Sequence, residues 1–439
     1  MTTELFALID GQEVGRVREE RNGRLKFTYN AGWRERRDAY PLSLSLPLAS
    51  REHDHDPISA FLWGLLPDNE RVLDTWARRF GVSAHNPFRL IANVGEDCAG
   101  AAQFVRPERV EVVRDASRDT IQWLTETDVA ARLRELSTDG AAWRRLDDVG
   151  QFSLAGAQPK TALLFKDGRW GIPSGRTPTT HILKPPLVEY DGFAENEHLC
   201  LELAGALELP AARSRVMRFE DQIAIVIERY DRIHSGDRIL RIHQEDICQA
   251  LGVLPTRRYE ADGGPGIKAM VDLLRSYSSE SVADIATFVD ALILNWLIGG
   301  TDAHAKNYSI LIGAGTVVRL APLYDVVSAL PYPSLSPHKI KLAMKIGGEY
   351  FVKKIGARQW EKLALDVRIN PDDLLSRVTR STERVADVVH RVCQEAERDG
   401  LHHPIVKRFE EAVATRAVAC TRALSAGTRA PTNVTPESP

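Results

Sequence analysis

The chain has 439 residues, of which 44% are hydrophobic and 27% are charged, a composition typical of a globular protein long enough for two domains or lobes. Its 57 Lys and Arg residues and 60 Asp and Glu residues leave a net charge of −3, so the overall charge does not favour a nucleic-acid or membrane-surface partner. The five cysteines are far apart and form no C-x-x-C pair, which excludes a zinc knuckle or disulfide framework and predicts a reducing cytoplasm.

The sequence also lacks the patterns of export and membrane insertion. No basic segment followed by an apolar stretch opens the chain, so we expect no secretory signal. The longest apolar run, residues 291–298, is far shorter than the roughly 18 residues that a membrane-spanning helix needs. We interpret this run as part of a buried helix.

The first 140 residues are predicted to form an α+β domain. Residues 5–9, 14–17 and 25–29 have strand-like patterns separated by turn sequences. Helical spacing of apolar residues follows over 58–80, and a further helix is expected from 127 to 136. Thr125 is the candidate N-cap of that helix, and a charged stretch ending near Gly140 marks the predicted boundary of the domain, residues 1–140.

The rest of the chain divides into a β-rich part and a helical part. Strand-like runs and one helical run, at 161–165, 181–184, 195–207 and 223–227, predict a β-rich unit of residues 141–230. Helical periodicity dominates a second unit, residues 231–425, and is clearest at 244–252, 267–276, 282–297, 359–367 and 374–396. Residues 426–439 are rich in Pro, Ser and Thr and are predicted to be a disordered tail.

The loop after the apolar run carries the first candidate catalytic residues. Asp302 precedes Asn307 by five positions, the spacing at which protein kinases place the catalytic-loop Asp and a magnesium-binding Asn. The same spacing also fits a polar turn in which Asp302 caps a helix and Asn307 bonds to the backbone. The spacing alone does not decide between these interpretations.

Two further segments supply parts that phosphoryl transfer needs. Asp325 follows an apolar strand candidate at 317–323 and is a candidate magnesium ligand, although the sequence after it is not D-F-G. Small residues in the segment 150–161 allow a backbone to approach phosphate closely. This segment, however, matches neither G-x-G-x-x-G nor the Walker A pattern.

A lysine completes the set. Lys184 ends the strand candidate 181–184, so its ammonium group can contact phosphate at the strand end. The acidic partner of this lysine is expected on the next helix, where Glu195, Glu197 and Glu202 are available and Glu197 is our choice. The order of these parts, within a β-rich unit followed by a helical unit, indicates a kinase.

Four segments resemble those of the HipA family, the toxin kinases of bacterial HipBA toxin–antitoxin modules. They are 41–47 (PLSLSLP), 152–164 (FSLAGAQPKTALL), 177–184 (TPTTHILK) and 300–307 (GTDAHAKN). The resemblance covers most of the chain. It implies an α+β protein with a two-lobed protein-kinase-like fold, comprising a β-rich ATP lobe and an all-helical C-terminal lobe, and an appended N-terminal domain. It also implies ATP and Mg²⁺ as cofactors.

The resemblance further implies roles for individual residues. Asp302 is the catalytic base, Asn307 and Asp325 bind magnesium, and Ser153 is the autophosphorylated serine whose modification ejects its loop and switches the kinase off. The implied ATP contacts are Ala155, Gly156, Ala157, Gln158, Pro159, Lys160, Lys184, Glu228, Arg229, Tyr230, His304 and Tyr324. Among them, residues 228–230 are implied to form the hinge that meets adenine. Pro159 departs from the commoner Q-E-K sequence of the family, and because proline has no backbone N–H the loop has one donor fewer.

The partners of the family complete the expectation. They are a HipB-like helix-turn-helix antitoxin, operator DNA bound through that antitoxin, and a protein substrate such as glutamyl-tRNA synthetase or another aminoacyl-tRNA synthetase. Phosphorylation of such a target inhibits translation and promotes dormancy. Two alternatives stay open at this point: a catalytically silent co-repressor that binds the antitoxin, and a small-molecule kinase of related fold.

Overall fold

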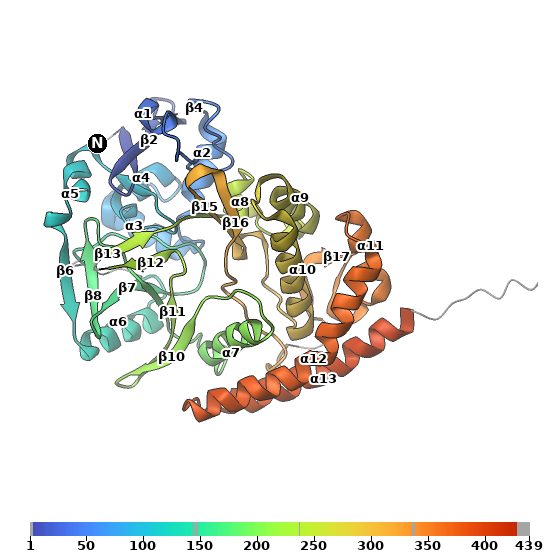
Figure 1. Cartoon of the computed structure of the whole chain (residues 1–439). Coiled ribbons are helices and arrows are strands. Elements are labelled where there is room, and N and C mark those ends of the chain that lie inside the picture. Colours follow the sequence, from blue (N-terminus) through green and yellow to red (C-terminus); the bar gives the residue numbers. More distant parts are fainter. Residues whose placement is uncertain (1–2, 144, 146–147, 237, 336–338, 428–439) are drawn as a thin grey trace, which may run out of the picture.

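Five antiparallel strands form the first sheet of the computed structural model, which describes residues 3–427 apart from 144, 146–147, 237 and 336–338 (Figure 1). The strand order is β4-β3-β2-β1-β5, with β1 Glu4–Ile9, β2 Gln12–Glu19, β3 Leu25–Tyr29, β4 Glu52–His53 and β5 Gln103–Val105. Alternate residues of β3 are buried because successive side chains of a strand point to opposite faces.

Helices pack on the buried face of this sheet. They are α1 Ala31–Arg34, α2 His55–Gly64, α3 Glu70–Phe80 and α4 Pro87–Val94. Helix α5 (Val110–Arg114) follows β5 and packs on the other face of the sheet, where Val110 and Val113 share a small core with Leu8. Side chains of α2, α3 and α4, among them Phe61, Trp76 and Phe88, share one core with the strands. The helical pattern predicted over 58–80 is therefore two helices, because the chain turns at Leu65 and Asn69 caps α3.

The second sheet has six antiparallel strands in the order β10-β11-β9-β7-β8-β6. Their bounds are β6 Thr120–Leu124, β7 Thr161–Lys166, β8 Arg169–Ser174, β9 His181–Lys184, β10 Ser214–Phe219 and β11 Gln222–Glu228. Helix α6 (Glu126–Thr138) starts at the predicted cap Thr125 and shares the core of this sheet through Val129 and Leu133. Since β6 and α6 belong to this sheet rather than to the first, we propose that the domain boundary lies between α5 and β6 instead of at residue 140.

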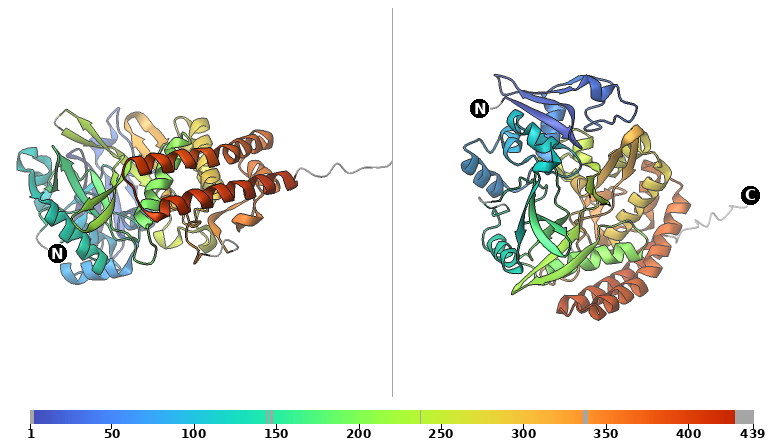
Figure 2. Two further views of the ribbon diagram at one scale, coloured as in Figure 1. Left: turned by 90° about the horizontal axis from the view of Figure 1, so that it is seen from below. Right: turned by 60° about the vertical axis from the view of Figure 1, so that its left-hand side comes forward.

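The remainder of the chain is mainly helical (Figure 2). Its helices are α7 Phe193–Ala206, α8 Ile247–Ala250, α9 Ile267–Tyr277, α10 Ser281–Ile298, α11 Ala357–Asp366, α12 Pro371–Arg398 and α13 Pro404–Gly427. The helix predicted at 244–252 is wrong: a strand occupies its first residues, and a capping box between Asp246 and Gln249 starts only the single turn α8. Residues 428–439 of the predicted tail lie outside the described residues.

Helix α10 is the one helix in the described ranges that is long and apolar enough, by length and composition, to cross a membrane. Its side chains are mostly enclosed, however, and Phe288, Trp296 and Ile298 belong to the main core of the helical part. The interpretation of residues 291–298 as part of a buried helix is therefore confirmed.

Three small sheets join these parts. The hairpin β12–β13 (Arg232–Ser235 and Arg238–Arg241), the sheet β14-β15-β16 (His243–Asp246, Ser309–Gly313 and Val317–Leu320) and the hairpin β17–β18 (Lys341–Ile346 and Glu349–Phe351) complete the strands. The segment 41–47 docks the first domain on β14, because the Leu44 N–H donates to Glu245 Oε1 at 2.8 Å and His243 Nε2 donates to the Leu42 carbonyl at 2.8 Å.

Candidate active site

A cavity of about 520 Å³ lies where the first domain, the second sheet and the helical part meet, a volume within the usual range of small-molecule sites. Gly64, Asp68 and Ala99 from the first domain contribute to its wall. All of the predicted ATP and metal contacts line this cavity except Pro159. The sequence-predicted residues therefore come together, although they are spread over 171 positions (325 − 155 + 1).

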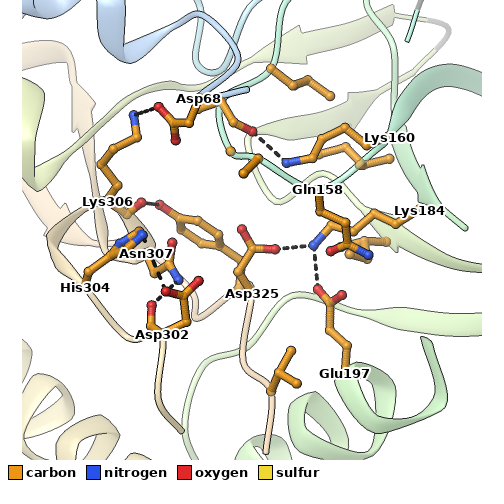
Figure 3. Close-up of a pocket in the computed structure, with 18 of the residues that line it drawn as sticks. Asp68, Gln158, Lys160, Lys184, Glu197, Asp302, His304, Lys306, Asn307 and Asp325 are labelled. Carbon is orange, nitrogen blue, oxygen red and sulfur yellow. Dashed lines mark hydrogen bonds and ion pairs between the residues drawn. The ribbon is translucent and has the colours of Figure 1, made fainter. Parts of the chain in front are cut away.

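Lys184, at the end of β9, is the centre of an ion cluster (Figure 3). Its Nζ donates to Glu197 Oε1 on α7 at 2.7 Å and also to Asp325 Oδ1. Burial opposes the charge on Lys184, but Asp325 and Glu197 outweigh it and raise the pKa of the lysine. Glu197, our choice among three candidates, is thus the partner of Lys184, and its own pKa is raised by complete burial.

Asp325 lines the cavity in an unusual backbone conformation. Its φ is 52°, in the left-handed region that residues other than glycine seldom adopt. The carboxylate faces Lys184 (Figure 3). Burial would raise the pKa of Asp325, but Lys184 and Lys160 hold it well below its ordinary value. The group is therefore an anion at neutral pH.

The loop between α10 and β15 carries the other candidates. Helix α10 ends at Ile298, and the φ of 62° at the following Gly299 lets the chain leave the helix sharply. The side chain of Asp302 is 67% exposed, and His304 Nε2 lies 4.0 Å from its Oδ1. Asn307 Nδ2 donates to the Asp302 carbonyl at 2.7 Å, which is the backbone bond that the polar-turn interpretation expects. The loop is thus a polar turn and, at the same time, part of the cavity wall.

His304 presents an unsatisfied atom in this cavity. Its Nδ1 is buried and has no hydrogen-bond partner within the described part of the chain. Burial lowers the pKa of His304, and Asp302 opposes this effect. A neutral imidazole with a free nitrogen at a small-molecule site is suited to a ligand contact.

Residues 154–158 form another part of the cavity wall, and their loop is held by the first domain. Asp68 N–H donates to the Gly156 carbonyl at 3.0 Å, and Asn69 Nδ2 donates to the Ala157 carbonyl at 3.2 Å. Ser153 is fully buried, and its Oγ donates to the Leu65 carbonyl at 2.7 Å. Ser153 therefore faces the first domain and not the cavity.

Lys160 follows this loop and also lines the cavity. Its Nζ donates to the Ala155 carbonyl at 2.7 Å and lies 5.3 Å from the centre of the Trp143 ring. Burial lowers the pKa of Lys160 to about 8, although Asp325 partly compensates. Pro159 lies outside the cavity lining and packs near Gly140, so its lack of an N–H does not remove a donor from the cavity wall.

The predicted hinge, Glu228 to Tyr230, borders the cavity at the end of β11. The Arg229 guanidinium instead bonds to Asp231 at 2.9 Å, to Thr179 Oγ1 at 2.9 Å and to the Cys98 carbonyl at 2.7 Å. The backbone of Arg229 is also engaged, because its N–H donates to the Thr180 carbonyl at 2.9 Å and its carbonyl accepts from the Arg232 N–H at 3.1 Å. The Tyr230 ring lies 5.9 Å from that of Tyr324.

Known proteins share this architecture. A sequence model of the HipA N-terminal domain matches residues 5–105, and one of the HipA-like C-terminal domain matches residues 152–399, more than half of the chain. The chain belongs to the HipA family. This membership makes it a serine/threonine kinase of the toxin–antitoxin type and confirms the predicted α+β, two-lobed kinase-like fold.

Two relatives illustrate the range of the HipA family. The chain is 36% identical to the protein Y4mE of Sinorhizobium fredii (strain NBRC 101917 / NGR234), over 93% of this chain and 96% of that protein. The name of Y4mE describes it as a kinase. It is 30% identical to the serine/threonine-protein kinase toxin HipA of Shewanella oneidensis MR-1 over 83% of each chain. A solved complex of HipA, HipB and operator DNA from that organism contains a chain with a TM-score of 0.82 and 25% identity, covering 96% of this chain and 98% of that one.

The donor atoms near Asn307 and Asp325 determine whether this HipA-family chain can hold magnesium. In the described ranges, no group of three or more His, Cys, Asp or Glu side chains could hold a metal ion. Magnesium bound with a nucleotide, however, needs only one or two protein carboxylates in addition to phosphate oxygens and water. Asp325 offers an ionised carboxylate, and because Asn307 uses its Nδ2 on the backbone, its amide oxygen is left to face a ligand. The two residues fit the ion.

Sequence reasoning missed the contacts that the first domain and β14 make with the catalytic loop. Lys306 Nζ is buried and donates to Asp246 Oδ2 at 2.9 Å, to the Gly64 carbonyl at 3.3 Å, and lies 3.8 Å from Asp68 Oδ1 (Figure 3). No local pattern predicts these contacts, since Gly64 and Lys306 are 242 positions apart. The one signal in the sequence was the position of Lys306 itself, between the candidate catalytic residues Asp302 and Asn307.

Proposed function

We propose that this HipA-family kinase transfers the γ-phosphate of ATP to a serine of a protein substrate, with Asp302 as the base. The single observation that carries this proposal is the convergence of the Lys184–Glu197–Asp325 cluster, Asn307 and Asp302 on one cavity. These are the parts that phosphoryl transfer requires: a lysine held by an acid, two oxygen ligands for metal, and a carboxylate beside the acceptor.

Each residue has one task in the proposed reaction. Lys184 and Lys160 contact the phosphates of ATP, and Gly156, Ala157 and Gln158 approach them from the loop side. Asn307 and Asp325 would hold Mg²⁺, which neutralises charge that develops on the γ-phosphate. Asp302 accepts the proton of the serine hydroxyl as that oxygen attacks. Tyr230, Tyr324 and His304 border the nucleotide, and the backbone of Glu228 and Arg229 forms the hinge.

The proposed partners follow from the relatives. The Shewanella oneidensis chain that this fold resembles occurs in a complex with HipB and operator DNA, which supports a HipB-like antitoxin that brings the chain to DNA. We propose an aminoacyl-tRNA synthetase as the protein substrate, with inhibited translation and dormancy as the result. The five cysteines are all free and buried, which supports the cytoplasm as the site of action.

Autophosphorylation of Ser153 is the proposed off switch. A phosphate on this residue carries between about −1.5 and −2 charges and cannot occupy a fully buried position next to a backbone carbonyl. The loop would therefore leave its place against the first domain. Since Lys160 and the small residues of the loop move with it, the phosphate contacts would be lost.

A phosphotransfer assay tests the proposal. Radiolabelled ATP, Mg²⁺ and dephosphorylated casein as a serine-containing acceptor are incubated with wild type, with Asp302→Asn, and with Asp387→Asn as a matched control on the exposed face of α12. We expect Asp302→Asn to lose at least about 100-fold in rate and Asp387→Asn to match wild type. Equal labelling by Asp302→Asn would show that Asp302 is not the base.

The same assay separates the alternatives. A wild-type chain that neither binds ATP nor transfers phosphate would be the silent co-repressor. Phosphate that appears only on metabolites of a cell extract, and on neither casein nor this chain, would indicate the small-molecule kinase.

A further inference from the structure

Tyr259 contacts the proposed base directly from outside the catalytic loop. Its hydroxyl donates to Asp302 Oδ1 at 2.5 Å. In the part of the chain that the structure describes, no other donor lies within hydrogen-bond distance of this carboxylate, and the His304 ring nitrogen is 4.0 Å away. One oxygen of Asp302 is thus engaged, and Oδ2 has no hydrogen bond from these residues.

The chain holds Tyr259 firmly in this place. The preceding residue, Arg258, accepts a backbone hydrogen bond from Ala305 of the catalytic loop at 3.4 Å. The side-chain carboxylate of the following residue, Glu260, accepts a hydrogen bond from the backbone N–H of Lys345 at 2.6 Å. Two neighbours in sequence are therefore tied to two different elements, and the tyrosine between them has little freedom.

A glycine turn after Tyr259 fixes the loop further. Gly263 has a φ of +78°, and a Cβ at Gly264 would lie 1.8 Å from the Arg257 carbonyl oxygen. No other residue fits there without moving the backbone. The His304 ring packs edge-on against the Tyr259 ring, with centroids 4.7 Å apart and planes at 83°. The ring is thus positioned by both the loop and the site.

We infer that Tyr259 is a positioning residue that orients Asp302 for proton transfer from the acceptor serine. This inference rests on the proposed function. Tyr259 binds Oδ1 and so turns Oδ2 toward the substrate, where it takes the proton of the serine hydroxyl. The serine oxygen forms a bond to the γ-phosphorus as the bond from that phosphorus to the β–γ bridging oxygen breaks, and the electron pair leaves with ADP.

The exposure of the pair explains why the base needs such support. A carboxylate that is 67% exposed is free to rotate unless something holds it, because its terminal torsion is broad. Burial and the charge on Asp302 raise the pKa of Tyr259 to about 12, so the hydroxyl keeps its proton and remains a donor through the neutral pH range.

The test is steady-state kinetics of the full chain with ATP, Mg²⁺ and casein. Tyr259→Phe removes only the hydroxyl, and Tyr277→Phe at the exposed end of α9 is the matched control. We expect Tyr259→Phe to lower kcat by about ten-fold or more, as for the loss of a hydrogen bond to a charged group. The KM for ATP and the melting temperature should stay at the wild-type values, and Tyr277→Phe should match wild type throughout.

A double-mutant cycle distinguishes orientation of the base from general support of the site. In the Asp302→Asn background, adding Tyr259→Phe should change the residual rate by less than two-fold, because the group that it orients is gone. Full additivity, or an unchanged kcat in the single variant, overturns the inference and leaves the proposed function in place. A wild-type chain without phosphotransfer overturns both.

Discussion

Replacing Lys160 by methionine should make the protein more stable and abolish ATP binding at the same time. The Lys160 ammonium group is buried beside a carbonyl oxygen and an indole ring, and burial brings its pKa from the ordinary value of 10.5 down to about 8. The unfolded chain therefore binds this proton up to pH 10.5 and the folded chain only up to about 8. Between these values the unfolded state binds more protons, so the wild-type free energy of unfolding rises with pH.

The magnitude follows from the same difference. Each pH unit between two pKa values corresponds to about 1.4 kcal/mol, so keeping the buried charge at pH 7 costs the fold up to about 3 kcal/mol. Met has a similar length and no charge, so Lys160→Met should raise the free energy of unfolding by about 1–3 kcal/mol at pH 7. The gain should fall to about half at pH 9.5, where the folded wild type has already lost the proton.

Urea unfolding at pH 7 and 9.5 measures this effect, with titration of a fluorescent ATP analogue as the readout of binding. Lys407→Met, on the exposed face of α13, is the matched control and should leave stability and ATP binding unchanged. A Lys160→Met variant that is less stable than wild type at pH 7, or whose gain is the same at both pH values, would refute the reasoning. Stability would then not be limited by the buried charge.

Three further predictions concern other buried groups. Glu197→Gln should lower kcat/KM for ATP at least about ten-fold, because Lys184 loses one of its two carboxylate partners, and initial rates at varied ATP measure this. Ser153→Glu should lose ATP binding, whereas Ser153→Ala should keep it, since only a charge is incompatible with the buried position; calorimetric titration separates the two. Glu245→Gln should raise the melting temperature more at pH 8.5 than at pH 5. Burial raises the pKa of Glu245 to about 8, so the folded wild type keeps this proton at pH values where the unfolded chain has lost it. The wild type therefore loses stability as the pH rises toward 8. Equal shifts in melting temperature at both pH values would contradict this explanation.

The parts of the site that sequence predicted are those carried by single short segments. Asp302, Asn307 and Asp325 follow apolar runs and Lys184 ends one, and all four line the cavity, so periodicity and spacing were enough to select them as candidates. The helix at 127–136 was equally local, because Thr125 and the apolar positions after it are sufficient to start it.

What sequence could not provide was the contact between distant segments. Strand β6 pairs with β8 some fifty positions later, and nothing in residues 120–124 indicates that partner. Tyr259 falls in an irregular loop, where no period reports which side chain meets Asp302. The family resemblance implied that Arg229 belongs to a hinge. The direction of its side chain, however, depends on Asp231 and on the Cys98 carbonyl of the first domain.

Asp97 of the first domain determines whether the two domains of this protein can be separated. Its carboxylate lies 3.0 Å from Arg232, 3.1 Å from Arg241 and 3.5 Å from Arg229, and it accepts hydrogen bonds from both the N–H and the hydroxyl of Thr179. The two family domains are matched as separate sequence units. Removing the first domain would, however, leave the three buried arginine side chains without the Asp97 carboxylate. The two domains that the sequence separates therefore share one buried ion cluster in the folded protein. We expect the kinase domain to be less stable without the first domain.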